Sequence, residues 1–271
     1  MASHDSVKKT LLVAFLLCVI FSVVVSAAAV ALSKPQAINK ELDRQKNILV
    51  AADLYKPGID INKTFETIET RAINIKTGEV VSDFNVKTYD DRKAAKSPGK
   101  NIELDPKVDT GDIKRVASVY VIYLIKNTAG ELDQIVLPIF GKGLWSTMYG
   151  FISLDKDLKT VRGITFYEHG ETPGLGGEIE NPRWQKIWQG KKAFAENGEM
   201  QLRVIKGEVN NESANAKHQI DGLAGATITS RGVSGTIEFW LGEQGFGKYL
   251  NTLRSELGLK AETSTKGENN G

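Results

Sequence analysis

The sequence has almost none of the residues that build metal centres and covalent cross-links. Its only cysteine is Cys18, which excludes disulfides within the chain and cysteine-ligated metal clusters. The histidines, His4, His169 and His218, are too scattered for a metal site of common spacing. The formal net charge is only +2, and lysine and arginine are spread along the chain. The sequence therefore supports neither a protein-bound metal nor a nucleic acid partner.

A long uncharged run stands near the N-terminus. Leu11 to Leu32 contains no charged residue and, as a helix, spans about 33 Å, enough to cross the hydrocarbon core of a membrane. A cleaved signal peptide is the rival interpretation, with Lys8 and Lys9 as its basic start and a cleavage site near Ser26 to Ala29. We favour an uncleaved anchor because the run exceeds the usual signal-peptide core of about 7–15 residues. The flanking charges leave the orientation open.

The remaining pattern predicts an α+β fold, in which a single N-terminal transmembrane helix precedes a mainly antiparallel sheet flanked by helices. Pro35 is expected to mark the exit from the membrane, and residues 90–112 are expected to form an exposed loop. The predicted strands are Arg115–Lys126, Leu132–Phe140, Met148–Leu154, Val161–Tyr167 and Gln201–Lys206. The predicted helices are Ala37–Tyr55, Ile59–Arg71, one that starts at Pro182 with Asn181 as its cap, and Ser230–Leu257. Trp184 and Trp188 are expected to pack in the core.

The most informative segment is Asp221–Ser230, with the sequence DGLAGATITS. Small residues allow a ligand to approach its backbone, three hydroxyl side chains (Thr227, Thr229 and Ser230) accompany them, and a helical pattern follows. This layout suits a phosphate at a helix N-terminus, where free amides and the helix dipole favour an anion. The lysine of a P-loop and the glycine spacing of a dinucleotide site are both missing. The structural alternative is a small-residue turn that caps a helix, with Ser230 as the N-cap.

These ten residues resemble the flavinylation motif D-x-x-(S/T)-G-A-T-x-T, in which the threonine after Gly-Ala carries FMN through a phosphoester. The resemblance makes Thr227 the acceptor. Ala224 stands where the motif has serine or threonine, so one hydroxyl near the phosphate is missing. The length of the match favours a flavin site over a structural turn. The other residues that it brings into the site are Asp221, Gly222, Gly225, Ala226, Thr229 and Ser230.

Two glycine-rich loops are candidates to hold the isoalloxazine ring, which needs apolar packing on its faces and hydrogen-bond donors at its edge. They are GKGLWSTMY (residues 141–149) and HGETPGLGG (residues 169–177). Since each adjoins a predicted strand of one hairpin system, both are expected at one end of the sheet. The predicted ring contacts are Gly143, Leu144, Trp145, Ser146, Glu171, Thr172, Gly174 and Leu175. The candidates to balance the phosphodiester charge are Lys142, Lys217 and His218.

Over nearly its whole length the chain resembles the C subunit of the bacterial sodium-translocating NADH:quinone reductase. The resemblance rests on the N-terminal span and on the segments QKNILVAADLY, GKGLWSTMYGFISLD, FYEHGETPGLGGEIENPRW and DGLAGATITSRGV followed by EFWLG. It implies one helix in the cell inner membrane and a periplasmic FMN-binding domain. It also implies that a flavin transferase, which uses FAD and Mg²⁺, joins FMN to Thr227 with release of AMP.

The same resemblance implies a membrane complex of six subunits that passes electrons from NADH to ubiquinone and exports Na⁺. This subunit would relay electrons and would not bind NADH itself, in agreement with the missing dinucleotide fingerprint. No catalytic acid or base is expected, because the chemistry belongs to the flavin. Two alternatives stay open: the corresponding flavoprotein of an Rnf-type ferredoxin:NAD⁺ oxidoreductase, and a non-redox, membrane-anchored scaffold protein whose Gly-Ala-Thr turn is structural.

These expectations divide the chain into four parts. Residues 1–33 hold a cytoplasmic tip and the membrane anchor, and residues 34–114 a helical stalk with a peripheral α/β segment. Residues 115–258 form the FMN-binding domain. Residues 259–271, which lack large apolar side chains from Glu262 onward, form a disordered tail.

Overall fold

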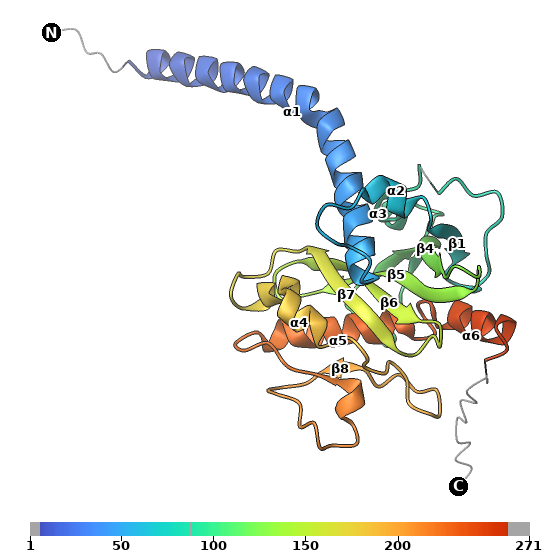
Figure 1. The fold of residues 1–271 in the computed structure, drawn as a ribbon. Helices are drawn as coiled ribbons and strands as arrows, with labels where there is room; N and C mark the ends of the chain where they lie inside the picture. Colours follow the sequence, from blue (N-terminus) through green and yellow to red (C-terminus); the bar gives the residue numbers. More distant parts are fainter. Residues whose placement is uncertain (1–5, 87, 260–271) are drawn as a thin grey trace. The chain divides into compact units, whose positions relative to one another are not determined.

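The computed structural model describes residues 6–86 and 88–259, and the chain separates into two compact units, residues 1–44 and 45–271. The first unit is the N-terminal part of a single long helix, α1 (Val7–Ala51; Figure 1). Among the described residues, α1 is the one helix long and apolar enough to cross a membrane, with a mean hydropathy of 2.9 over an 18-residue window in which no side chain is buried. The predicted N-terminal apolar helix is confirmed. The four-part division of the chain stays a prediction.

Helix α1 does not divide at Pro35, where the sequence predicted an exit and then a separate stalk helix over Ala37–Tyr55. Pro35 lies inside the helix. Proline removes a single backbone hydrogen bond, and the helix-forming residues on both sides of it continue the helix. The helix ends at Ala51, before the predicted end, because Asp53 takes the left-handed backbone conformation (φ 57°) that stops a helix.

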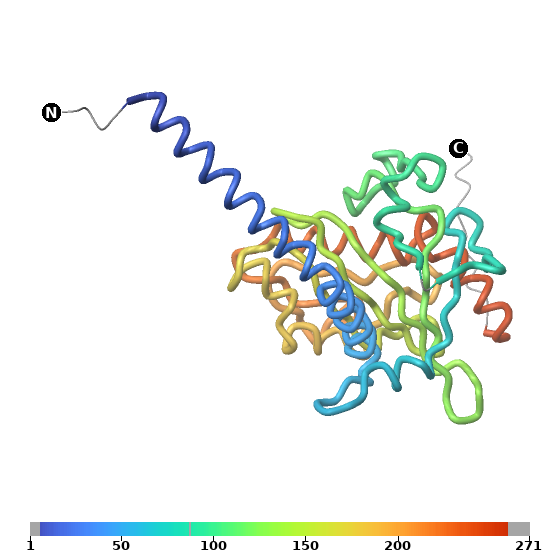
Figure 2. The backbone as a smooth tube through the Cα atoms, turned by 90° about the horizontal axis from the view of Figure 1, so that it is seen from above, coloured from blue at the N-terminus to red at the C-terminus, as the bar shows by residue number. Residues whose placement is uncertain are grey.

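A five-stranded sheet forms the centre of the second unit, and every neighbouring pair of strands in it is antiparallel. The strand order is β1-β4-β5-β6-β7. In Figure 2 the chain runs through β4 to β7 where the tube changes from green to yellow. The strands are β1 (Glu69–Asn74), β4 (Val119–Lys126), β5 (Leu132–Lys142), β6 (Thr147–Asp155) and β7 (Val161–Glu168). The predicted fold class is confirmed, as are the strands that correspond to β5, β6 and β7.

Both faces of this sheet are buried. Alternate side chains of β4 enter different apolar clusters, as the period of two in a strand requires. Tyr120 joins the larger cluster, which contains Trp240 of helix α5 (Thr227–Leu241). Val121 joins a smaller cluster, which contains Ile48 from the end of α1. Helix α5 and the last turns of α1 therefore cover opposite faces of the sheet.

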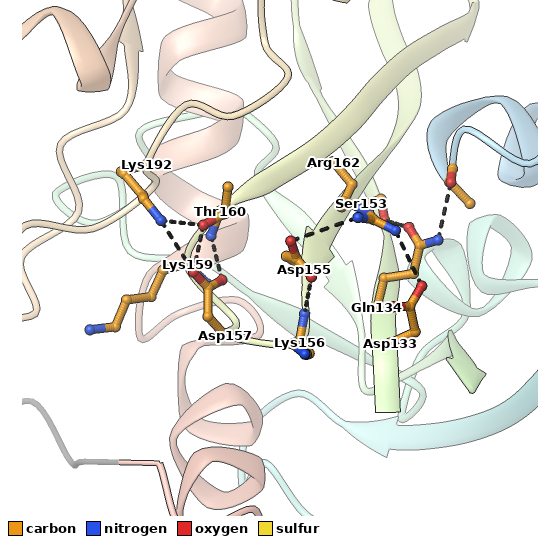
Figure 3. A network of polar contacts seen from close by, with 11 residues as sticks. Asp133, Gln134, Ser153, Asp155, Lys156, Asp157, Lys159, Thr160, Arg162 and Lys192 are labelled. Atoms are coloured by element: carbon orange, nitrogen blue, oxygen red, sulfur yellow. Dashed lines mark hydrogen bonds and ion pairs between the residues drawn. The ribbon is translucent and has the colours of Figure 1, made fainter. Parts of the chain in front are cut away.

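A buried polar pair ties the end of α1 to the sheet. The Gln134 side chain donates to the carbonyl oxygen of Ala52 (3.1 Å) and accepts from the hydroxyl of Ser153 (2.7 Å). Figure 3 shows this pair beside a more exposed cluster in which Asp157 binds Lys192. Both polar atoms of the Gln134 side chain are hydrogen-bonded, so the complete burial of this side chain is compatible with a stable core.

Two segments differ from the sequence predictions because they pair with distant parts of the chain. The predicted helix over Ile59–Arg71 is only α2 (Ile61–Phe65), and its last residues enter β1, which pairs with β4. The predicted loop over residues 90–112 contains α3 (Asp91–Lys96), which starts where the Asp90 side chain accepts a hydrogen bond from the Lys93 amide. The same loop contains β2 (Asn101–Glu103).

Strand β2 pairs with β3 (Arg115–Ala117), so the predicted strand over Arg115–Lys126 is divided into β3 and β4. The predicted strand over Gln201–Lys206 shortens to β8 (Arg203–Val204), which runs parallel to β9 (Gln219–Ile220). These pairings are non-local, and local residue patterns do not report them.

The helices of the C-terminal half follow the prediction more closely. Helix α4 (Pro182–Lys186) starts with Pro182 and is capped by Asn181, and Trp184 and Trp188 are buried, as predicted. The predicted helix over Ser230–Leu257 divides at its glycines into α5 and α6 (Gly247–Glu256). Two 3-10 helices, η1 (Gly176–Glu180) and η2 (Ala216–His218), complete the described elements. The predicted disordered tail lies, apart from residue 259, outside the described residues.

Candidate flavin site

The two glycine-rich loops meet at one end of the sheet, as predicted. Residues 143–146 connect β5 to β6, and residues 169–177 follow β7 directly. The antiparallel pairing of β6 with β7 brings Tyr149 opposite Glu168, so the two loops leave the sheet side by side. The amide of Gly170 donates to the hydroxyl of Ser146 (2.5 Å), which links the loops directly.

Glu171 lies at the centre of this junction. Its carboxylate accepts hydrogen bonds from the amides of Leu144 (3.1 Å), Trp145 (2.9 Å) and Ser146 (3.3 Å). It accepts a further one from the hydroxyl of Thr229 in α5 (2.6 Å). Three segments that are far apart in the sequence therefore converge on one buried carboxylate.

This arrangement changes the part expected of the loop amides. The first loop was a candidate to offer hydrogen-bond donors to the edge of the ring. The amides of Leu144, Trp145 and Ser146 instead bind Glu171, and that of Gly143 binds the Ser146 carbonyl (2.8 Å). Glu171 is itself 5 % exposed and faces these donors. The sequence around residues 144–146 does not indicate that their amides bind a carboxylate of another loop.

The charge of Glu171 gives the site a defined pH dependence. Burial on its own raises the pKa of the Glu171 carboxyl, but the hydrogen bonds from Thr229 and from the amides of Trp145, Leu144 and Ser146 outweigh it, so the pKa is lowered. A carboxyl with a lowered folded-state pKa stabilises the fold above its ordinary pKa of about 4.3, and this stabilisation is lost as the pH falls through the lowered value.

We therefore expect the difference in unfolding free energy between wild type and Glu171→Gln to be constant from about pH 7 to about pH 5 and to shrink below about pH 4. Chemical denaturation of both proteins across this range measures it. A difference that already shrinks between about pH 7 and about pH 6 contradicts the hydrogen-bonded carboxylate.

The motif segment leads into the N-terminus of α5. Ala226 is the N-cap residue and provides no side-chain hydrogen bond, so Ser230 is not the cap that the structural alternative assumed. Ser230 lies inside the first turns, where its hydroxyl accepts from the Leu223 amide (3.2 Å). Gly225 takes a left-handed conformation (φ 70°), in which a Cβ would lie 3.0 Å from Leu175. Because residue 225 is glycine, the motif turn can pack against the loop of residues 169–177.

The three hydroxyl groups of the motif have different surroundings. Thr229 is 1 % exposed and donates to Glu171, and Ser230 is 5 % exposed and binds the Leu223 amide. Thr227, the first residue of α5, is exposed. Of the three, Thr227 alone is accessible to another molecule.

A small cavity of about 170 Å³ lies beside Thr227. Lys206 and Arg231 line it, and neither was predicted from the sequence. Arg231 is four residues after Thr227 on α5 and so lies on the same helix face, a signal that the sequence did contain. Lys206 is brought there by the β8–β9 pairing and by a hydrogen bond from the Gly222 amide to the Gly207 carbonyl (2.7 Å).

The cations proposed from the sequence lie elsewhere. Lys142 donates to the Trp145 carbonyl (3.3 Å), and the ring of buried His218 lies 2.7 Å from the Lys192 carbonyl. Lys217 lines a separate cavity with Lys192. None of the three lines the cavity beside Thr227.

The remaining predicted residues frame the site. Asp221 accepts from the Val209 amide (2.7 Å) and so positions the segment that carries Lys206. Gly222 packs against the carbonyl of Ile205, where a Cβ has no space. Thr172 and Gly174 are exposed in the second loop, and the Thr172 carbonyl accepts from the Leu175 amide (3.1 Å).

Large apolar side chains are exposed on the segments that meet at Glu171. Trp145 is 65 % exposed and Ile228 54 % exposed, and Leu144 and Leu175 are also exposed. They come from both loops and from α5, the three segments joined by Glu171. A planar apolar ligand with an anionic group fits this surface, because the apolar side chains offer packing, and the uncapped helix N-terminus with Lys206 and Arg231 attracts a phosphate. Within residues 6–86 and 88–259, no three or more His, Cys, Asp or Glu side chains are grouped to hold a metal ion.

The exposed threonine at a helix N-terminus and the apolar loop side chains are suited to an anionic, planar cofactor, and the N-terminal apolar helix is that of a membrane-anchored protein. Residues 143–242 match the FMN-binding domain family, and FMN is the cofactor. Similar proteins from Yersinia pestis and Vibrio vulnificus (strain YJ016) bear the name of the C subunit of the Na(+)-translocating NADH-quinone reductase. The first is 45 % identical over 93 % of this chain and 95 % of that protein, and the second is 46 % identical over 94 % and 98 %.

The fold comparison agrees. The crystal structure of NqrC from Shewanella oneidensis superposes with a TM-score of 0.74 at 37 % identity and covers 80 % of this chain and 99 % of that one. The C subunit of the reductase from Parabacteroides distasonis superposes with a TM-score of 0.62 at 27 % identity, over 81 % and 96 %. The chain belongs to the family of C subunits of the Na(+)-translocating NADH-quinone reductase, as the resemblance predicted.

Proposed function

We propose that this protein is the electron-relay subunit of a membrane complex that oxidises NADH, reduces ubiquinone and exports Na⁺, and that it carries FMN on Thr227 through a phosphoester. One observation carries the covalent part of the proposal: Thr227 is exposed at the start of α5, whereas Thr229 and Ser230 are buried and hydrogen-bonded within the chain. Family membership supports the rest.

One group of residues would bind the phosphate of FMN, and another would bind its ring. The phosphate would lie at the N-terminus of α5, held by its free amides and balanced by Lys206 and Arg231. The ring would pack on Leu144, Trp145 and the second-loop side chain Leu175. When bound, FMN supplies the one- and two-electron chemistry of the protein. The chain itself supplies orientation and electrostatics, so no side chain has to act as an acid or a base.

The location follows from the same proposal. Helix α1 would cross the inner membrane once, and the second unit would lie in the periplasm, beside the other members of a complex of six subunits. A flavin transferase would reach Thr227 before or during assembly, which its exposure allows. Protease added to intact spheroplasts would digest a periplasmic second unit and spare a cytoplasmic one.

The two alternatives predict different properties. An Rnf-type protein would also carry a covalent flavin but would work with ferredoxin, whereas the similar proteins from Yersinia pestis and Vibrio vulnificus bear the name of an NADH-quinone reductase. A scaffold protein would carry no flavin at all, which the FMN-binding family match disfavours.

The direct test is the colour of the full chain, co-expressed with a flavin transferase, after denaturation and dialysis. We expect it to stay yellow with one flavin per chain. Complete loss of flavin into the dialysate would contradict covalent attachment. The same chain expressed without the transferase is the control and is expected to be colourless.

A further inference from the structure

The most unusual group near the site is the Glu171 carboxylate. Electron relay alone does not explain why a charged group is buried there. It is almost fully buried, and among the described residues no lysine or arginine forms an ion pair with it. An unpaired buried charge is costly unless hydrogen bonds compensate it. Four donors do so here, three of them amides of consecutive residues.

The two oxygens of this carboxylate connect different parts of the site. Oε1 accepts from the amides of Trp145 and Ser146, whereas Oε2 accepts from the Leu144 amide and from the Thr229 hydroxyl. One end therefore holds the loop that presents Trp145, and the other end joins this loop to the first turn of α5, two residues after Thr227. Since an ionised carboxylate accepts at both of its ends and an amide at only one, an amide cannot satisfy the same set of donors.

Neighbouring glycines leave space for this junction. A Cβ at Gly143 would lie 2.5 Å from Glu171 Oε1, and a Cβ at Gly176 would lie 2.5 Å from the Thr229 hydroxyl oxygen. Both distances are far below contact distance, and neither glycine needs a left-handed backbone. The space around the carboxylate therefore accounts for two glycines that the loop conformation alone does not require.

We propose that Glu171 is a positioning residue: its carboxylate locks the loop of residues 143–146 to the start of α5, and so fixes the ring platform relative to Thr227 while placing a negative charge close to the ring. The inference rests on the proposed function in two respects: that a flavin ring packs on this loop and that FMN is attached to Thr227. The lock itself requires no flavin. The negative charge opposes electron uptake and so lowers the reduction potential of a flavin beside it.

Two pairs of variants separate the lock from a merely structural contact. In Glu171→Gln the side-chain oxygen can still accept from Trp145 and Ser146, but the –NH₂ group then faces the Leu144 amide, donor against donor. Thr229→Val removes the link to α5, and Thr229→Ser keeps the hydroxyl. Glu243→Gln, at an exposed residue after α5, is the matched charge control.

The first readout is hydrogen exchange of residues 144–146 in the full chain made without transferase. We expect exchange about tenfold faster in Glu171→Gln, strongest at Leu144, and faster exchange in Thr229→Val, with wild-type rates in Thr229→Ser and Glu243→Gln. The second readout is the midpoint potential of the flavinylated chains. It is expected to be more positive in Glu171→Gln than in wild type and unchanged in Glu243→Gln.

Unchanged exchange at Leu144 in Glu171→Gln overturns the lock, and an unchanged potential overturns the electrostatic part. Failure of the proposed function is a separate result. The exchange rates of wild type and Glu171→Gln are compared without flavin, so they test the lock even if the wild-type chain takes up no flavin.

Discussion

Replacing Thr227 by valine is expected to abolish covalent flavin attachment completely. Thr227 is the one motif hydroxyl that a transferase can reach, and valine has nearly the same shape but no nucleophilic oxygen. The intact mass of the full chain, co-expressed with a flavin transferase, measures the effect. Wild type and Thr227→Ser should gain one FMN minus water, and Thr227→Val should gain nothing.

Thr229→Val is the decisive companion variant. Thr229 is buried against Glu171, so its loss should disturb the site without removing the attachment point. We expect this variant to gain the full mass of one flavin. If Thr227→Val is modified and Thr229→Val is not, the motif is read in the wrong register and Thr227 is not the attachment point.

Replacing Trp240 by alanine is expected to lower the free energy of unfolding by about 3–5 kcal/mol. Its side chain is fully buried, donates to the Phe140 carbonyl (2.6 Å), and packs with its ring centroid 4.9 Å from that of Tyr120. Alanine would leave a large cavity between α5 and the sheet. Because α5 carries Thr227 at its start, the position of this threonine depends on this contact.

Trp145→Ala provides a matched control for the stability measurement. Trp145 is the same residue type but is 65 % exposed, so its removal should change the free energy of unfolding by no more than about 0.5 kcal/mol. Urea unfolding followed by circular dichroism compares the two variants. Equal losses in both would contradict the packing described for α5.

Much of the fold could be predicted because its central strands are local in sequence. The strands β5, β6 and β7 are apolar runs joined by short turns, so both their positions and their pairing follow from the local pattern. Strand β1 has no such pattern: its residues alternate between polar and apolar only weakly, and it becomes a strand because it pairs with β4, about fifty residues later.

The residues of the candidate site could be predicted where they lie in one continuous segment of the sequence. The ten-residue motif contains Thr227, and the two loops were expected to meet because the hairpin brings their ends together. Lys206 and the partners of Glu171 could not be predicted in the same way. A surface lysine and a loop glutamate carry no local signal. The β8–β9 pairing positions the lysine, and three consecutive amides of the other loop position the glutamate.

The most direct test of the proposed relay is NADH-driven ubiquinone reduction by the complete membrane complex, compared between wild type and Thr227→Val. With equal amounts of this chain in both membranes, we expect quinone reduction to be lost in the variant while NADH still reduces the cofactors that precede this protein. Quinone reduction at the wild-type rate in Thr227→Val membranes would contradict the role of Thr227-bound FMN as an obligatory electron relay.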